Sequence, residues 1–281
     1  MADKILVTTD LSKNSAAGIK FGIQLASQHK AMLIFYLMLD LQKPTRWSSD
    51  QFKRYRETEI DLATRSLNKF VEDIYRKSGG RVGKYQCVVE EGSAVGESIL
   101  EYASASKVNF ICIGTQGAGT FRRLLGTHTS YVLSNSPIPV FVVPKGYRSE
   151  KISQMLYASD LSDLKYELKR VTRFASGLKA KVAVLHYDYL YDVKETRDRL
   201  SAIAKKHQES GVVFHFQKLN IDVTLDNHLK KAVKKFKPSL VVLFTNQHRD
   251  WYERLFLSSK SAEVSFDTTK PLLIFGKRSG K

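Results

Sequence analysis

Short apolar runs alternate along the chain with longer amphipathic stretches. Runs such as NFICIG and VFVV contain almost no polar residue, which is typical of strands that are covered on both faces of a sheet. The strands of the first half are predicted at residues 4–9, 31–38, 85–90, 108–113 and 139–143.

The amphipathic stretches between these runs have the apolar spacing of helices. Ser12 and Ser15 precede the first of them and are candidate N-cap residues. Strands separated by helices imply parallel strands joined by right-handed crossovers, so we predict a five-stranded, doubly wound α/β domain. The helices are predicted at residues 14–29, 50–77, 95–106 and 127–136.

The two halves of the chain repeat one pattern. ILVTTDLS (5–12) and MLYASDLS (155–162) are both apolar runs that end in a small polar residue followed by Asp-Leu-Ser. Further matches follow in the same order, among them KVNFICIGTQ with KPSLVVLFTN, and IPVFVVPK with KPLLIFGK. A repeat in fixed order predicts two tandem domains of the same fold. We expect them at residues 1–147 and 151–281, with a linker at 144–150.

Composition indicates a soluble globular protein. The chain has 281 residues, of which 43% are hydrophobic and 26% charged. No signal peptide or membrane-spanning segment is evident, so we expect a cytoplasmic protein without a membrane partner. Cys87 and Cys112 lie inside apolar strand runs, which favours buried thiols in a reducing compartment.

The net charge of +17 is the unusual feature of the composition. Such a charge attracts nucleotides, nucleic acids and anionic membranes alike, so it identifies no specific partner. The densest basic segment, HLKKAVKKFK (228–237), has its lysines and apolar residues at helical spacing. We interpret it as an amphipathic surface helix, with contact to nucleic acid or another acidic partner as the less favoured alternative.

Candidate chemistry lies just after two of the predicted strands. In doubly wound sheets ligands bind at the carboxyl ends of the strands, where the strand order reverses. Strand one ends in Thr8, Thr9 and Asp10, and strand four is followed by GTQGAGTFRRLLGTHTSYVL (114–133). Glycines before a helix N-terminus suit a bound phosphate, although glycines also serve tight turns.

These motifs resemble those of the universal stress proteins. Nucleotide-binding members carry Gly-x-x-Gly, nine residues, and then Gly followed by Ser or Thr. Gly114, Gly117, Gly126 and Thr127 take these places, with eight residues between the second and third glycines. The runs KILVTTDLS, LIFYLML and PIPVFVVPK extend the resemblance over the first copy. It implies a Rossmann-like, adenine nucleotide alpha-hydrolase-like fold that binds ATP, with or without Mg²⁺.

The resemblance also implies a role for individual residues. Asp10 would contact the adenosine part, Met38 would lie against adenine, and Gly92 would offer backbone near the nucleoside. For Asp10 alone, a turn or helix cap is the alternative. The predicted nucleotide-binding residues are Thr8, Thr9, Asp10, Met38, Gly92, Gly114, Gly117, Gly126, Thr127 and Thr129.

The second copy lacks the glycines. Its matching stretch, LFTNQHRDWYERLFLSSKSAEV (243–264), contains none, and Phe244 or Thr245 replaces the first glycine, depending on register. We therefore expect a degenerate, structural second domain. Ser258, Ser259 and Ser261 leave another anion as an alternative ligand there.

The remaining expectations concern partners and catalysis. Members of the family pair through their fifth strands, so Pro139 to Val143 and Pro271 to Phe275 could pair within one chain as a pseudo-dimer, and such chains could further form a homodimer. The sequence offers no catalytic constellation, and His128 is the only attractive acid or base. We predict a stress-response or signalling module that binds ATP and acts through a protein partner. The alternatives are a scaffold that binds no nucleotide and a slow ATP hydrolase.

Overall fold

The computed structural model describes residues 3–78, 83–115, 127–208, 211–220, 222–223, 225–245 and 270–277. The chain divides into two compact units, and the main boundary between them falls between Ser149 and Glu150. We call them the N-terminal unit and the C-terminal unit.

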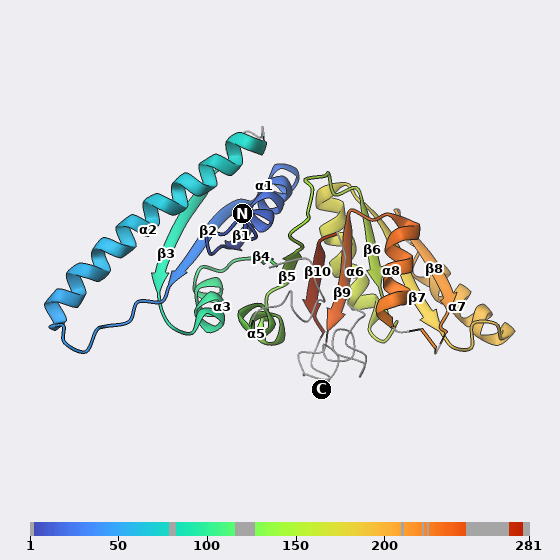
Figure 1. Cartoon of the computed structure of the whole chain (residues 1–281). Coiled ribbons are helices and arrows are strands. Elements are labelled where there is room, and N and C mark those ends of the chain that lie inside the picture. The colour runs from blue at the N-terminus through green and yellow to red at the C-terminus, as the bar shows by residue number, and fades with distance from the viewer. Residues whose placement is uncertain are drawn as a thin grey trace. The chain divides into compact units, whose positions relative to one another are not determined.

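The N-terminal unit contains a parallel sheet in the order β3-β2-β1-β4-β5 (Figure 1). This order reverses direction between β1 and β4, as in doubly wound folds, and it confirms the predicted fold class. The described elements of this unit are β1 (Lys4–Thr8), α1 (Ala16–His29), β2 (Met32–Leu39), α2 (Ser49–Ser78), β3 (Tyr85–Glu91), α3 (Val95–Ala105), β4 (Phe110–Gly114), α5 (Thr127–Asn135) and β5 (Val140–Val143).

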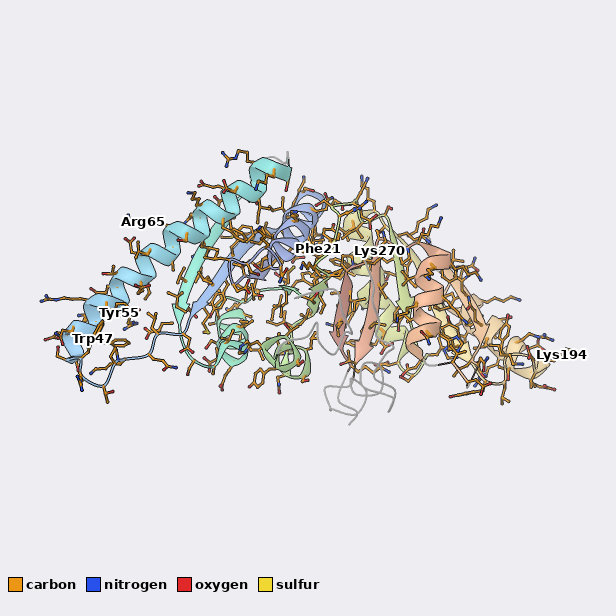
Figure 2. The ribbon with its side chains drawn as sticks, in the orientation of Figure 1. Phe21, Trp47, Tyr55, Arg65, Lys194 and Lys270 are labelled. Carbon is orange, nitrogen blue, oxygen red and sulfur yellow. The ribbon has the colours of Figure 1, made fainter. Side chains whose placement is uncertain are left out.

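Helices cover both faces of this sheet, which explains the continuous apolar runs. α1 packs against α2, and α3 packs against α5. The side chains of Ile5, Leu6 and Val7 in β1 are fully buried. Phe21 of α1, labelled in Figure 2, lies with its ring centroid 5.0 Å from that of Phe141 in β5. The core therefore extends across the sheet from β1 to β5.

Helix α2 packs through its second half. Its buried residues all lie in the last dozen positions: Leu67, Val71, Ile74 and Tyr75. Near its first turn, Trp47 and Tyr55 lie together with ring centroids 5.2 Å apart, and Trp47 is 37% exposed (Figure 2). The N-terminal half of α2 thus gains its order from local contacts and helix propensity more than from burial.

The C-terminal unit repeats the same topology, with a parallel sheet in the order β10-β9-β6-β7-β8. The predicted tandem arrangement of one fold is therefore confirmed. The described elements are β6 (Gln154–Ala158), α6 (Leu164–Leu178), β7 (Lys181–Asp188), α7 (Lys194–Lys206), β8 (Val212–Lys218), α8 (Leu225–Phe236), β9 (Leu240–Thr245) and β10 (Leu272–Gly276).

Strand register decides which residue replaces the first glycine in the second copy. In the N-terminal unit Val7 lies opposite Cys112, two residues before Gly114. In the C-terminal unit Tyr157, which corresponds to Val7 in the repeat, lies opposite Val242. Phe244 therefore stands in the place of Gly114.

Two smaller expectations can be compared with the structure. The basic segment forms α8, in which Leu229 and Ala232 are buried, as an amphipathic helix requires. Cys112 is buried, but Cys87 is only half-buried, because β3 lies at the edge of the described sheet order and its residues are mostly half-exposed. Within the described residues, no helix is both long and apolar enough to cross a membrane.

Candidate nucleotide-binding site

A cavity of about 290 Å³ lies at the carboxyl ends of β1, β2 and β4, where the strand order reverses. Six of the predicted binding residues line it: Thr8, Thr9, Asp10, Met38, Gly114 and Thr129. They come from three strands, from the turn after β1 and from α5, so the fold brings together residues that are far apart in the sequence. The site has the position expected for a ligand in this class of sheet.

The other predicted residues do not line the described part of the cavity. Gly92 lies against Met38, since a Cβ atom there would be 3.0 Å from Met38 Cε. Its N–H donates to the carbonyl of Leu39 at 2.9 Å, so Gly92 supports Met38 and its own donor is already used. Gly117 and Gly126 lie outside the described residues. Thr127 is the first residue of α5, and its side chain is likewise not among those that the structure describes.

A tight turn after β1 presents Asp10 at the cavity. Leu11 has a φ of 61°, a left-handed conformation that costs a leucine roughly 1–2 kcal/mol. The turn is held by Leu11 N–H donating to Thr9 Oγ1 and by Ser12 N–H donating to Asp10 Oδ1, both at 3.0 Å. Asp10 therefore serves as a turn cap and also lines the cavity.

The electrostatics of Asp10 keep it ionised at neutral pH. Burial raises the pKa of Asp10, but hydrogen bonds from Ser12 and Ser15 outweigh it, and the pKa lies below its ordinary value. The cavity thus carries one acceptor-only carboxylate at its rim, which suits ligand hydroxyl or amino donors.

One of the two candidate N-cap residues of α1 is confirmed in its position. Ser15 occupies the N-cap position, but its side chain makes no capping hydrogen bond. Its hydroxyl instead bonds with Thr9 Oγ1 at 2.8 Å and donates to the carbonyl of Ser12 at 3.0 Å. Because these partners are local and polar, the hydroxyl ties the start of α1 to the end of β1 and fixes this wall of the cavity.

Gly114 is required by packing within the unit. A Cβ atom at Gly114 would lie 3.2 Å from Ser15 Cα and 3.3 Å from Gly18 N. A Cβ atom at Gly18 would in turn lie 3.0 Å from Gly114 N. Paired glycines therefore let α1 approach the end of β4 closely, whether or not a ligand is bound.

Sequence reasoning missed several wall residues. Tyr36 lies two positions before Met38 in β2, and strand periodicity could have placed both on one face. Its hydroxyl donates to Glu90 Oε2 at 2.8 Å, and burial raises the pKa of Tyr36, so it stays a neutral donor. Val95 and Ile99 are four apart in α3, the spacing of one helix face. Ser15, Ile113 and His128 complete the described wall.

In the C-terminal unit, the place of Gly114 is taken by Phe244, whose ring changes the packing there. Its ring stacks on Phe275 with centroids 4.9 Å apart, and it meets Tyr157 edge-on at 5.5 Å. The guanidinium of Arg170 lies 4.5 Å from the centroid of Phe275. An aromatic cluster therefore fills the position at which the N-terminal unit has a bare glycine.

Comparison with known proteins agrees with this fold. The model of the universal stress protein family matches residues 1–144. The crystal structure of a universal stress protein from Archaeoglobus fulgidus is similar, with 15% identity, a TM-score of 0.71, and coverage of 98% of this chain and 99% of that one.

A putative universal stress protein from Pseudomonas aeruginosa is also similar, with 14% identity and a TM-score of 0.59, over 97% of this chain and 92% of its own. At these identities the likeness concerns the fold, and it extends over both halves. No curated protein matches the chain at a significant level.

Proposed function

Because the chain belongs to the universal stress protein family, we propose that its N-terminal unit binds ATP and that the bound nucleotide selects a conformer recognised by a protein partner. The observation that carries this proposal is the cavity at the switch point of the sheet, on which six motif residues converge. Its volume of about 290 Å³ suits the nucleoside part of the ligand.

The described wall residues fit a nucleoside. Met38, Ile99 and Ile113 supply apolar surface for a planar base. Asp10, held ionised, accepts from ribose hydroxyls or from amino groups of the base. The phosphates would extend toward α5, where Thr129 lines the cavity and an N-terminal helix turn favours negative charge.

Mg²⁺ would enter with the phosphates. The ion keeps several water ligands and is usually bound through phosphate oxygens and one or two carboxylates. Among the described wall residues, Asp10 is the one carboxylate. The net charge of +17 would draw the nucleotide toward the protein.

The partner role follows from how nucleotide sensing works in general. A ligand shifts a conformational equilibrium only as far as it binds one state better than another. Residues 116–126 join β4 to α5 and carry the remaining motif glycines. ATP bound in the cavity would favour one conformer of the N-terminal unit, and that conformer is what a partner protein would recognise.

The test compares two equivalent aspartates. Asp10 and Asp160 occupy the same turn in the two units, since Ser12 N–H and Ser162 N–H donate to their respective Oδ1 atoms at 3.0 Å. An Asp→Asn change keeps an oxygen for this turn and removes the charge. ATP binding to the full chain is measured by calorimetry for the wild type, Asp10→Asn and Asp160→Asn.

One ATP should bind per chain, and Asp10→Asn should weaken it about tenfold or more, because a hydrogen bond to a charged group contributes ~1.5–3 kcal/mol. Asp160→Asn should leave the affinity unchanged. No heat of binding in the wild type, and no nucleotide in mass spectra of the purified protein, would refute the proposal. Rapid release of ADP would instead support a hydrolase.

A further inference from the structure

The C-terminal unit contains a cavity of its own, at the carboxyl ends of β6, β7 and β9. It has a volume of about 180 Å³. Most of its wall surface is apolar, and the side chains that contribute to this apolar surface include Leu185, Leu219, Leu229, Leu243 and Phe244. A cavity of about 150 Å³ with such a lining is large enough to hold benzene. This one therefore has room for a compound of one or two rings, but it is too small for a whole nucleotide.

One polar group at this cavity is left unsatisfied. Glu167 lines the cavity and is only 1% exposed. Its Oε2 accepts a hydrogen bond from the Tyr157 hydroxyl. Its Oε1 is buried and has no hydrogen-bond partner among the residues that the structure describes. Buried acceptors are nearly always paired, so this oxygen calls for a donor.

The nearest cation does not supply that donor. Lys277 Nζ lies 3.8 Å from Glu167 Oε1, which is too far for a hydrogen bond. The ammonium is engaged elsewhere, since it pairs with Asp160 and donates to Ser162 Oγ at 3.0 Å. Glu167 Oε1 thus remains available to a group that enters the cavity.

The charges around the cavity disfavour an anionic ligand. The described lining holds two carboxyl groups, Asp160 and Glu167, against one ammonium, Lys277. His186 also lines it, and its Nδ1 donates to the carbonyl of Ser159 at 2.9 Å. The one ammonium of the described lining is thus outnumbered by carboxyl groups. A phosphate or carboxylate would therefore lose its hydration without gaining a cation in excess.

The geometry points to a second binding site in the C-terminal unit: we propose that this cavity binds an uncharged one- or two-ring aromatic molecule whose N–H or O–H donates to Glu167 Oε1. The aromatic ring system of the ligand lies between the leucines and the ring of Phe244, where aromatic rings pack edge to face or offset. The single donor satisfies the buried oxygen. This site is separate from the nucleotide site and does not depend on it.

The test uses a matched pair of probes on the full-length protein. Indole carries an N–H donor, and indene has the same shape without that donor. Binding of each is measured by calorimetry and by ligand-observed NMR. Indole should bind, and indene should bind about tenfold more weakly, since it leaves Glu167 Oε1 unsatisfied.

Substitutions at equivalent positions of the two units test which cavity binds indole. Leu229 of α8 lines the C-terminal cavity, and Ile99, its counterpart in α3, lines the N-terminal one. Leu229→Phe narrows the C-terminal cavity and should abolish indole binding while ATP binding is retained. Ile99→Phe narrows the N-terminal cavity and should leave indole binding unchanged. Circular dichroism verifies that both variants fold.

The outcomes are decisive in either direction. The proposal is overturned if the wild type does not bind indole at millimolar concentration, or if folded Leu229→Phe binds it as well as the wild type does. Equal affinity for indole and indene would overturn the role of Glu167. Should Leu229→Phe not fold, the ratio of the two affinities in the wild type still decides, together with hydrogen-exchange protection of β6 and α8 on addition of indole.

Discussion

Gly114→Ala should destabilise the N-terminal unit even when no nucleotide is present. The added Cβ would lie 3.2 Å from Ser15 Cα and 3.3 Å from Gly18 N. Both neighbours are backbone atoms of the α1 region, so no flexible side chain can move aside. The helix must shift by a few tenths of an ångström, and overpacking of this kind costs roughly 1–3 kcal/mol.

Gly83 provides the matched control. A Cβ atom there would meet nothing within 4 Å. Gly83→Ala should therefore be neutral or slightly stabilising, because alanine restricts the unfolded chain more than glycine does. The two variants make the same chemical change, and only the surroundings of the new methyl group differ.

Urea unfolding measures the difference. For an m value of about 2 kcal/mol per molar, a loss of 2 kcal/mol lowers the midpoint by about 1 M. Because the two units can unfold separately, hydrogen exchange of peptides from α1 and β4 should be followed along with spectroscopy. If Gly114→Ala is as stable as Gly83→Ala, the close approach of α1 does not require glycine, and the packing argument is refuted.

Three further predictions rest on burial and backbone conformation. Burial raises the pKa of Glu167, so the stabilising contribution of the folded acid is present below the unfolded pKa of about 4.3 and is lost as pH rises through the higher folded pKa. Glu167→Gln should therefore gain stability relative to the wild type in thermal melts as the pH rises above the unfolded pKa, whereas a constant difference would contradict the pKa shift. Lys30 ends α1 with a φ of 50°, so Lys30→Gly should raise the free energy of unfolding by roughly 0.5–1 kcal/mol, and a lower urea midpoint would contradict this. Burial raises the pKa of Cys87 to about 11 and also raises that of the fully buried Cys112. Native protein should thus react slowly with a maleimide at pH 7, and Cys112 only after unfolding; fast labelling of the native protein would show that the thiols are more accessible than described.

Hydrophobic periodicity was sufficient to predict the fold. The described strands and helices of the N-terminal unit differ from the predicted bounds by at most two residues. The apolar runs were clear because both faces of the sheet are covered, and the repeat placed Asp10 and Asp160 in the same turn. These features depend on residues close together in the sequence, so they can be recognised from the order of apolar and polar residues alone.

The site could be predicted only in part, because several roles depend on contacts between distant segments. The N–H of Gly92 is used by Leu39, and the hydroxyl of Ser15 is used by Thr9. No periodicity reveals such pairings. The burial of Glu167 beside Tyr157 in the C-terminal unit was likewise invisible in the sequence, since a single glutamate in an amphipathic helix normally faces solvent.

Phe244 makes the core of the C-terminal unit itself an obstacle to a glycine-rich phosphate loop. Its ring stacks on Phe275 and packs against Tyr157, so glycine in its place would remove a buried aromatic at a cost of about 3–5 kcal/mol. Whole domains are commonly stable by only about 5–15 kcal/mol. A chain with glycine at position 244 would lose much of that stability before any further glycine of a phosphate loop was in place. The barrier to nucleotide binding in this unit therefore lies in the packing of its core.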